Sequence, residues 1–149
     1  MATWSEFAAE EPEMASRTQS LFDAGRHKTM ATLRADGSPR ISWIECAFDG
    51  GQLTFGSMSN SRKGADLARD PRFALHGPTF HPIEGQEAMW PGEAKVAGRA
   101  LVRSTPDDDG ESFVADIDEV VVTHLNNDAT KLVVEWWTPA GGRRRIERE

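Results

Sequence analysis

Residues 29–57, TMATLRADGSPRISWIECAFDGGQLTFGS, alternate short runs of strand-forming residues with residues typical of tight turns. The turn segments Ala35–Ser38 and Asp49–Gly51 both contain Asp followed by Gly, a pair that accepts the left-handed backbone of hairpin turns. Three strands joined by such turns form an antiparallel meander. The strands predicted in this stretch are Thr29–Leu33, Arg40–Phe48 and Gln52–Ser57.

Helices are predicted on both sides of this stretch. Thr3 and Glu6 have the spacing of a capping box, in which each side chain accepts from the other residue's free backbone N–H. Pro12 suits the first turn of a second helix. After the stretch, Ser61 can cap a short helix that runs to Arg69.

Strand patterns return in the second half of the chain. They predict strands at Arg72–His76, Lys95–Arg103, Ile117–Leu125 and Leu132–Thr138, and a last strand that ends at Glu149. Gly77–Gly92 is predicted as a long loop and Thr105–Ser112 as an acidic linker. We therefore expect a mainly β fold, an antiparallel β-barrel of six to eight strands, since closure removes exposed strand edges. It has N-terminal helices and one short mid-chain helix, in a single domain over residues 1–149.

Composition limits the possible partners. The net charge of −7, from 17 basic and 24 acidic residues, disfavours a general binder of nucleic acid or of membrane surfaces. Cys46 is the only cysteine, which excludes an internal disulfide, and the four histidines lack metal-binding spacing, so we expect no metal site. No apolar run reaches the roughly 20 residues that cross a bilayer. The first residues do not resemble a signal peptide, so we expect a soluble, cytoplasmic protein.

The segment Ser57–Lys63 is the best candidate for a binding site. A strand ends there, a loop of small residues follows, and a helix begins with the adjacent cations Arg62 and Lys63. The free N–H groups and positive end of a helix stabilise phosphate, and serine hydroxyls such as those of Ser57 and Ser61 can donate to it. The alternative is an ordinary serine cap with solvated basic side chains.

Four pieces of the chain carry a family resemblance by their order and spacing. They are Ala31–Arg40, Asp49–Phe55, Ser61–Lys63 and Asp70–Leu75. Together they resemble the pyridoxamine 5′-phosphate oxidase-like split-barrel superfamily. The resemblance covers Lys28 to Arg103 well and the C-terminal hairpin more loosely. It implies that the expected barrel is a split barrel.

The resemblance also implies a homodimer that binds FMN or the deazaflavin coenzyme F-420 between its two barrels. In the oxidase an arginine opens a strand segment that lines the flavin, and a later Arg-Lys pair holds the phosphate. Carried over to this chain, the implied cofactor-binding residues are Arg40, Ile41, Ser42, Trp43, Ser57, Ser61, Arg62 and Lys63.

The chain departs from the oxidase at two points. The segment that ends in lysine in the oxidase ends here in Glu45, and the sequence lacks the oxidase's longer C-terminal part. We therefore do not expect oxidation of pyridoxamine phosphate. The length fits the flavin/deazaflavin-dependent reductases, which pass a hydride from reduced F-420 to an activated double bond of a small organic substrate. FMN remains the alternative cofactor, and no side chain stands out as catalytic.

Other readings stay open at this point. The same barrel could be a non-catalytic flavin or haem carrier, with His76, His81 or His124 as the haem ligand. The cluster Arg143–Arg145 is either a solvated tail or a site for the acidic tail of F-420. Trp136 and Trp137 are adjacent in a strand and must face opposite sides, so we expect one of them in the core.

Overall fold

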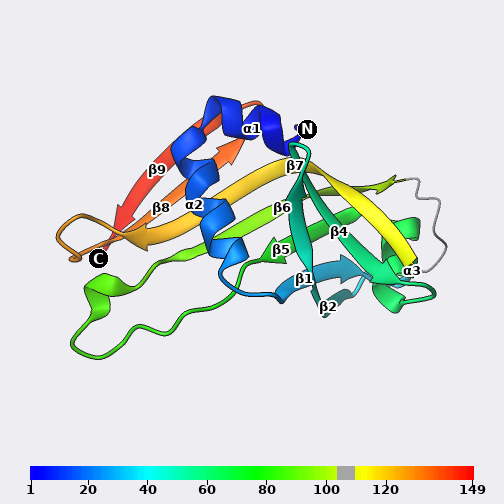
Figure 1. Cartoon of the computed structure of the whole chain (residues 1–149), viewed down its shortest axis with the longest axis horizontal. Helices are drawn as coiled ribbons and strands as arrows, with labels where there is room; N and C mark the ends of the chain where they lie inside the picture. Colours follow the sequence, from blue (N-terminus) through cyan, green and yellow to red (C-terminus); the bar gives the residue numbers. More distant parts are fainter. Residues whose placement is uncertain (104–109) are drawn as a thin grey trace.

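The computed structural model describes residues 1–103 and 110–149, and the fold is mainly β (Figure 1). All of its named strands belong to one nine-stranded sheet, and every pairing is antiparallel. The elements in chain order are α1 (Trp4–Glu10), α2 (Pro12–Asp23), β1 (Lys28–Leu33), β2 (Pro39–Ile44), β3 (Cys46–Asp49), β4 (Gln52–Met58), α3 (Arg62–Arg69), β5 (Arg72–His76), a short 3-10 turn (Glu87–Met89), β6 (Glu93–Arg103), β7 (Gly110–Leu125), β8 (Leu132–Thr138) and β9 (Gly142–Arg148).

The sheet is a split barrel and does not close completely. Its hydrogen-bonded path runs β2-β1-β5-β6-β7-β4-β3, and β8 and β9 extend it from β7 as a hairpin. The two end strands of the path, β2 and β3, are consecutive in the chain and are separated only by Glu45. One extended segment therefore pairs with β1 through its first half and with β4 through its second half.

This change of partner corrects the predicted strand count of six to eight. Arg40–Phe48 is not one strand, because its ladder is interrupted at Glu45 where the chain leaves β1 and joins β4. The linker prediction is also wrong in part. Gly110–Ser112 belong to β7, where they pair with the end of β4, whereas the linker residues 105–109 lie outside the described residues.

The three helices cover opposite ends of the sheet (Figure 1). The α1 helix starts with the predicted capping box, in which Thr3 Oγ1 accepts from Glu6 N at 3.1 Å and Glu6 Oε2 accepts from Thr3 N at 3.0 Å. With α2 it buries Phe7 and Phe22 in the core, where Trp137 is also buried. The α3 helix packs at the other end, against β1 and β4. Within the described residues, no helix combines the length and apolarity needed to span a membrane.

Candidate functional site

The turn from β4 into α3 brings the predicted serine and basic residues together. Asn60 has a φ of 62°, a left-handed conformation that asparagine tolerates and that reverses the chain after β4. Ser61 then caps the helix, and its Oγ accepts from Gly64 N at 3.0 Å. Arg62 and Lys63 follow as the first two residues of α3, as the sequence predicts.

A notch lined by oxygen atoms lies beside Gly64 in the first turn of α3. A Cβ at residue 64 would lie 2.9 Å from both Ser57 Oγ and Ser61 Oγ, and it would also clash with Glu111 Oε2. Ser57 Oγ is buried and has no hydrogen-bond partner in the part of the chain that the structure describes. The notch therefore exists because residue 64 lacks a side chain, and it contains an unsatisfied hydroxyl.

Two cations follow Ser61 as the first residues of α3. Lys63 Nζ lies 5.9 Å from the centre of the Trp43 ring, a cation–π distance that links α3 to the face of β2. The Arg62 side chain makes no hydrogen bond or ion pair with any described residue. Trp43 itself is 64% exposed and packs against His27, with 4.4 Å between the ring centres. Both side chains of the Arg-Lys pair are thus available to an anion.

Arg40 is turned toward a buried carboxylate. Its Nε donates to Asp66 Oδ2 at 2.7 Å, and Asp66 also accepts from Thr32 Oγ1 at 2.7 Å and from Arg69 Nη2 at 3.0 Å. Burial raises the pKa of Asp66, but the hydrogen bonds from Arg40, Thr32 and Arg69 lower it by more, so the pKa lies below its ordinary value. This cluster fixes α3 to β1 and β2.

The predicted segment Arg40–Trp43 is divided between the two faces of β2. Ile41 and Trp43 point outward and are 76% and 64% exposed, whereas Arg40 and Ser42 point inward and are half-buried. Ile41 borders a hollow of about 250 Å³ on the outer face, whose other walls come from β1, β5, β6 and β7 and are largely apolar. Only half of the segment therefore faces this outer surface.

Glu45, the residue that departs from the oxidase pattern, is paired with basic side chains. Its Oε1 lies 2.6 Å from Arg26 Nε and 3.8 Å from His27 Nε2. The Arg26 contact compensates the negative charge at the end of β2.

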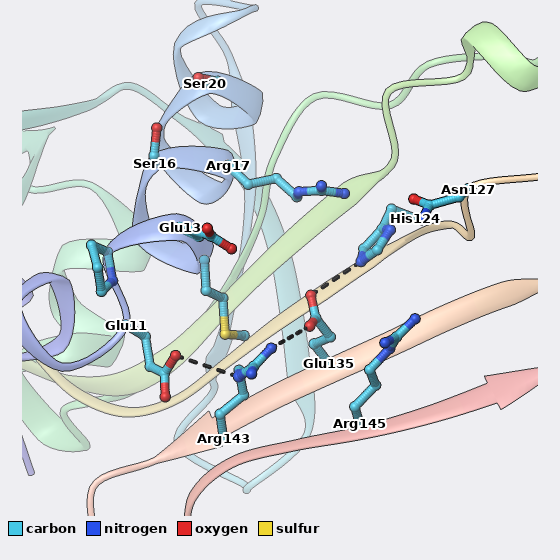
Figure 2. Close-up of a pocket in the computed structure, with 12 residues that line it drawn as sticks. Glu11, Glu13, Ser16, Arg17, Ser20, His124, Asn127, Glu135, Arg143 and Arg145 are labelled. Carbon is cyan, nitrogen blue, oxygen red and sulfur yellow. Dashed lines mark hydrogen bonds and ion pairs between the residues drawn. The ribbon is translucent and has the colours of Figure 1, made fainter.

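A larger hollow lies elsewhere, between α2 and strands β7, β8 and β9 (Figure 2). It measures about 1020 Å³, and a chain of alternating charges crosses it. Glu11 Oε2 lies 3.4 Å from Arg143 Nε, Arg143 Nη1 donates to Glu135 Oε1 at 2.8 Å, and Glu135 Oε2 lies 3.0 Å from His124 Nε2.

Most charged side chains in this chain of contacts are paired with one another. Burial raises the pKa of Glu135, but hydrogen bonds and charge from His124 and Arg143 lower it by more, so the net direction is downward. The cluster Arg143–Arg145 does not act as one patch: Arg143 and Arg145 face the hollow, while Arg144 lies opposite Trp136 on the other face. We interpret this network as a link between the N-terminal helices and the C-terminal hairpin.

Two of the histidines proposed as haem ligands, His76 and His124, have no free ring nitrogen. His76 Nδ1 lies 2.6 Å from Gly77 O and its Nε2 lies 3.3 Å from Glu93 Oε2. His124 Nδ1 lies 2.8 Å from Leu125 O, and its Nε2 contacts Glu135 as described above. Within residues 1–103 and 110–149, no group of three or more His, Cys, Asp or Glu side chains could hold a metal ion.

Two carboxylates of the α3 region were not among the predicted site residues. Asp66 lies three residues before Arg69, a helical ion-pair spacing that could have suggested its role. Glu111 gave no such signal, because it falls in a segment predicted as a linker and approaches Gly64 only through the pairing of β7 with β4.

Comparison with known proteins finds one matching family model and one curated relative. The sequence model of the family described as pyridoxamine 5′-phosphate oxidase matches residues 17–141. A curated protein of Cupriavidus necator, named pyridoxine/pyridoxamine 5′-phosphate oxidase, is 37% identical over 89 residues. That match covers 58% of this chain and 37% of the relative's length, so the chain spans well under two thirds of it.

Solved structures share the fold at low sequence identity. PhzG from Burkholderia lata 383, in complex with tetrahydrophenazine-1-carboxylic acid, has a TM-score of 0.69 at 11% identity, covering 100% of this chain and 97% of its own. A pyridoxamine 5′-phosphate oxidase-related, FMN-binding protein from Nostoc punctiforme has a TM-score of 0.62 at 13% identity, covering 100% and 98%. A haem-binding protein from Mycobacterium smegmatis has a TM-score of 0.59 at 18% identity, covering 92% and 59%.

Proposed function

The chain belongs to the pyridoxamine 5′-phosphate oxidase family, and from this membership we propose that it is a flavin- or deazaflavin-dependent oxidoreductase. The proposed cofactor is F-420 or FMN, both of which present a tricyclic ring and a phosphate. The proposed reaction is reduction of a small unsaturated organic substrate. The ring supplies the hydride chemistry when the cofactor is bound.

The notch beside Gly64 carries the proposal. A phosphate there would meet the unsatisfied hydroxyl of Ser57, the hydroxyl of Ser61 and the positive end of α3. Arg62 can donate through two nitrogens and Lys63 adds a compact charge. A buried donor without a partner is uncommon in folded proteins, so the state of Ser57 is what a phosphate site predicts.

The cofactor ring is assigned to the outer face of β2, next to this notch. Ile41 and Trp43 offer exposed apolar surface there, and Trp43 already contacts Lys63 at the start of α3. Arg40 donates to Asp66 through Nε and so positions the helix, and its contact with the cofactor stays a prediction. Ser42 lies on the inner face and is half-buried. The chain thus holds and shields the ring, and we assign no side chain to acid–base work.

We further propose that a second copy covers this outer face and completes the site. The face is largely apolar around the hollow that Ile41 borders, and isolated proteins rarely leave such surface open. A cofactor ring lying on Ile41 and Trp43 would then be enclosed between two copies, which excludes water from it.

The test is a set of fluorescence titrations with FMN, F-420 and riboflavin, which lacks the phosphate. Replacing Arg62 and Lys63 by Ala should weaken FMN and F-420 binding at least about tenfold, because each charged hydrogen bond contributes about 1.5–3 kcal/mol. Riboflavin binding should change little. The matched control is Arg17→Ala with Lys131→Ala, which removes two cations remote from α3. Unchanged dissociation constants for both phosphorylated ligands would refute the site.

Two alternatives are separated by further measurements. A non-catalytic carrier would bind the cofactor tightly without oxidising its reduced form when enones or quinones are supplied. A haem carrier would show a Soret band that is lost on replacing His76 or His124. Haem coordination by His76 or His124 would have to displace a contact, since both ring nitrogens of each already lie against an oxygen.

A further inference from the structure

Glu111 brings a negative charge to the notch that we assign to phosphate. It lies in β7 directly opposite Ser57 of β4, at the start of the β4–β7 ladder. From there its carboxylate crosses to the first turn of α3, where Oε2 occupies the space that a side chain at residue 64 would fill. The Glu111 side chain forms no hydrogen bond or ion pair with another described residue, although its backbone belongs to the β4–β7 ladder. No described cation is therefore ion-paired with its carboxylate.

No other acidic side chain of the described residues shares this notch in the same way. Asp66 lies in the same helix, but it accepts from Arg40, Thr32 and Arg69 and is 2% exposed. The other two atoms near the notch are the hydroxyl oxygens of Ser57 and Ser61, which can donate to a phosphate of any charge. Among the described groups at the notch, Glu111 is thus the one that repels a phosphate, and this repulsion increases with the phosphate's negative charge.

The two candidate cofactors differ in this charge. FMN ends in a phosphomonoester, which carries about −1.5 to −2 at neutral pH because its second pKa is about 6. The phosphate of F-420 is a diester and carries a single charge. Repulsion by a nearby carboxylate is proportional to the charge that it meets, so Glu111 opposes the monoester about twice as strongly as the diester.

We propose that Glu111 is a specificity-determining residue that makes the α3 site select a singly charged phosphodiester over a doubly charged phosphomonoester. The inference rests on the proposed function, because it concerns the same phosphate site. The property that decides between the two cofactors is the charge of the cofactor's phosphate group.

The test replaces Glu111 by Gln, which keeps the shape of the side chain and removes its charge. We expect FMN to bind more tightly to Glu111→Gln than to the wild type, and F-420 to gain less. The ratio of the two affinities should shift toward FMN by about fivefold or more. This is the effect on affinity of the repulsion between the carboxylate and the one additional phosphate charge of FMN, at about 4 Å in water-like surroundings. Riboflavin, which has no phosphate, should bind equally to both proteins.

The matched control is Asp118→Asn, which removes an exposed carboxylate from the same strand away from the notch. The inference is overturned if Glu111→Gln binds FMN no better than this control, or if FMN and F-420 gain equally. If replacing Arg62 and Lys63 weakens FMN while Glu111→Gln changes nothing, the phosphate site stands and only the role of Glu111 falls. If neither cofactor binds the wild type or the variant, the proposed function fails and this inference falls with it.

Discussion

Single residues around α3 are held by contacts between distant parts of the chain. Ser61, Arg62 and Lys63 are neighbours in sequence, so their placement at the helix start is predictable from a cap and a charge pair. The ion pair of Arg40 with Asp66 joins residues 26 positions apart, and Glu111 meets Gly64 only because β7 pairs with β4. Such contacts depend on strand order, which local pattern does not specify. The bond from Arg40 to Asp66 therefore has no local signal in the sequence, and cofactor binding by Arg40 stays a prediction.

Asp66 gives a prediction at the residue scale. Asp66→Asn leaves the half-buried Arg40 guanidinium without its counter-charge, so the free energy of unfolding in urea should fall by about 3–5 kcal/mol. FMN affinity should fall as well, because the cluster fixes the helix that carries Arg62 and Lys63. The control is Arg69→Ala, which should cost less, since Arg69 is 41% exposed and can be replaced by water. Equal losses for the two variants would contradict a special role for the Arg40 contact.

Secondary-structure elements were largely predictable, because capping and alternation are local. The capping box at Thr3 and the helix from Ser61 to Arg69 appear as predicted. The errors lie where an element changes partner. Burial alternates smoothly across Glu45, with Ile44 and Cys46 both turned inward, so the sequence pattern reads as one strand although the ladder breaks. Similarly, Gly110–Ser112 look like a turn, but pairing with β4 makes them strand.

The link between α2 and the C-terminal hairpin gives a prediction at the element scale. The Glu135 pKa is lowered in the folded protein, so its carboxylate stabilises the fold above the ordinary pKa near 4.5, and this contribution is lost as pH falls through the lower, folded-state pKa. Glu135→Gln should therefore cost about 1–3 kcal/mol at pH 5.5. The difference from the wild type should shrink on going to pH 3.

Urea unfolding at the two pH values provides the measurement, and Glu13→Gln provides the control. Glu13 lines the same hollow but is exposed, and its side chain has no hydrogen bond or ion pair with a described residue. Its replacement should leave the free energy of unfolding nearly unchanged. A Glu135→Gln penalty that stays constant from pH 5.5 to pH 3 would exclude an electrostatic origin.

At the scale of the whole molecule, the sheet is left open on its outer face, and this leads to the prediction of a dimer. Ile41 is 76% exposed at the edge of the apolar outer hollow, so a charge there would be buried unpaired if a second copy covers the face. Ile41→Arg should therefore convert a species of twice 16.4 kDa into the monomer in light scattering, and should weaken FMN binding. Met89→Arg is the matched control, because Met89 is equally exposed but lies in the long loop. A wild-type protein that is monomeric at micromolar concentration would mean that one chain alone must shield the cofactor ring.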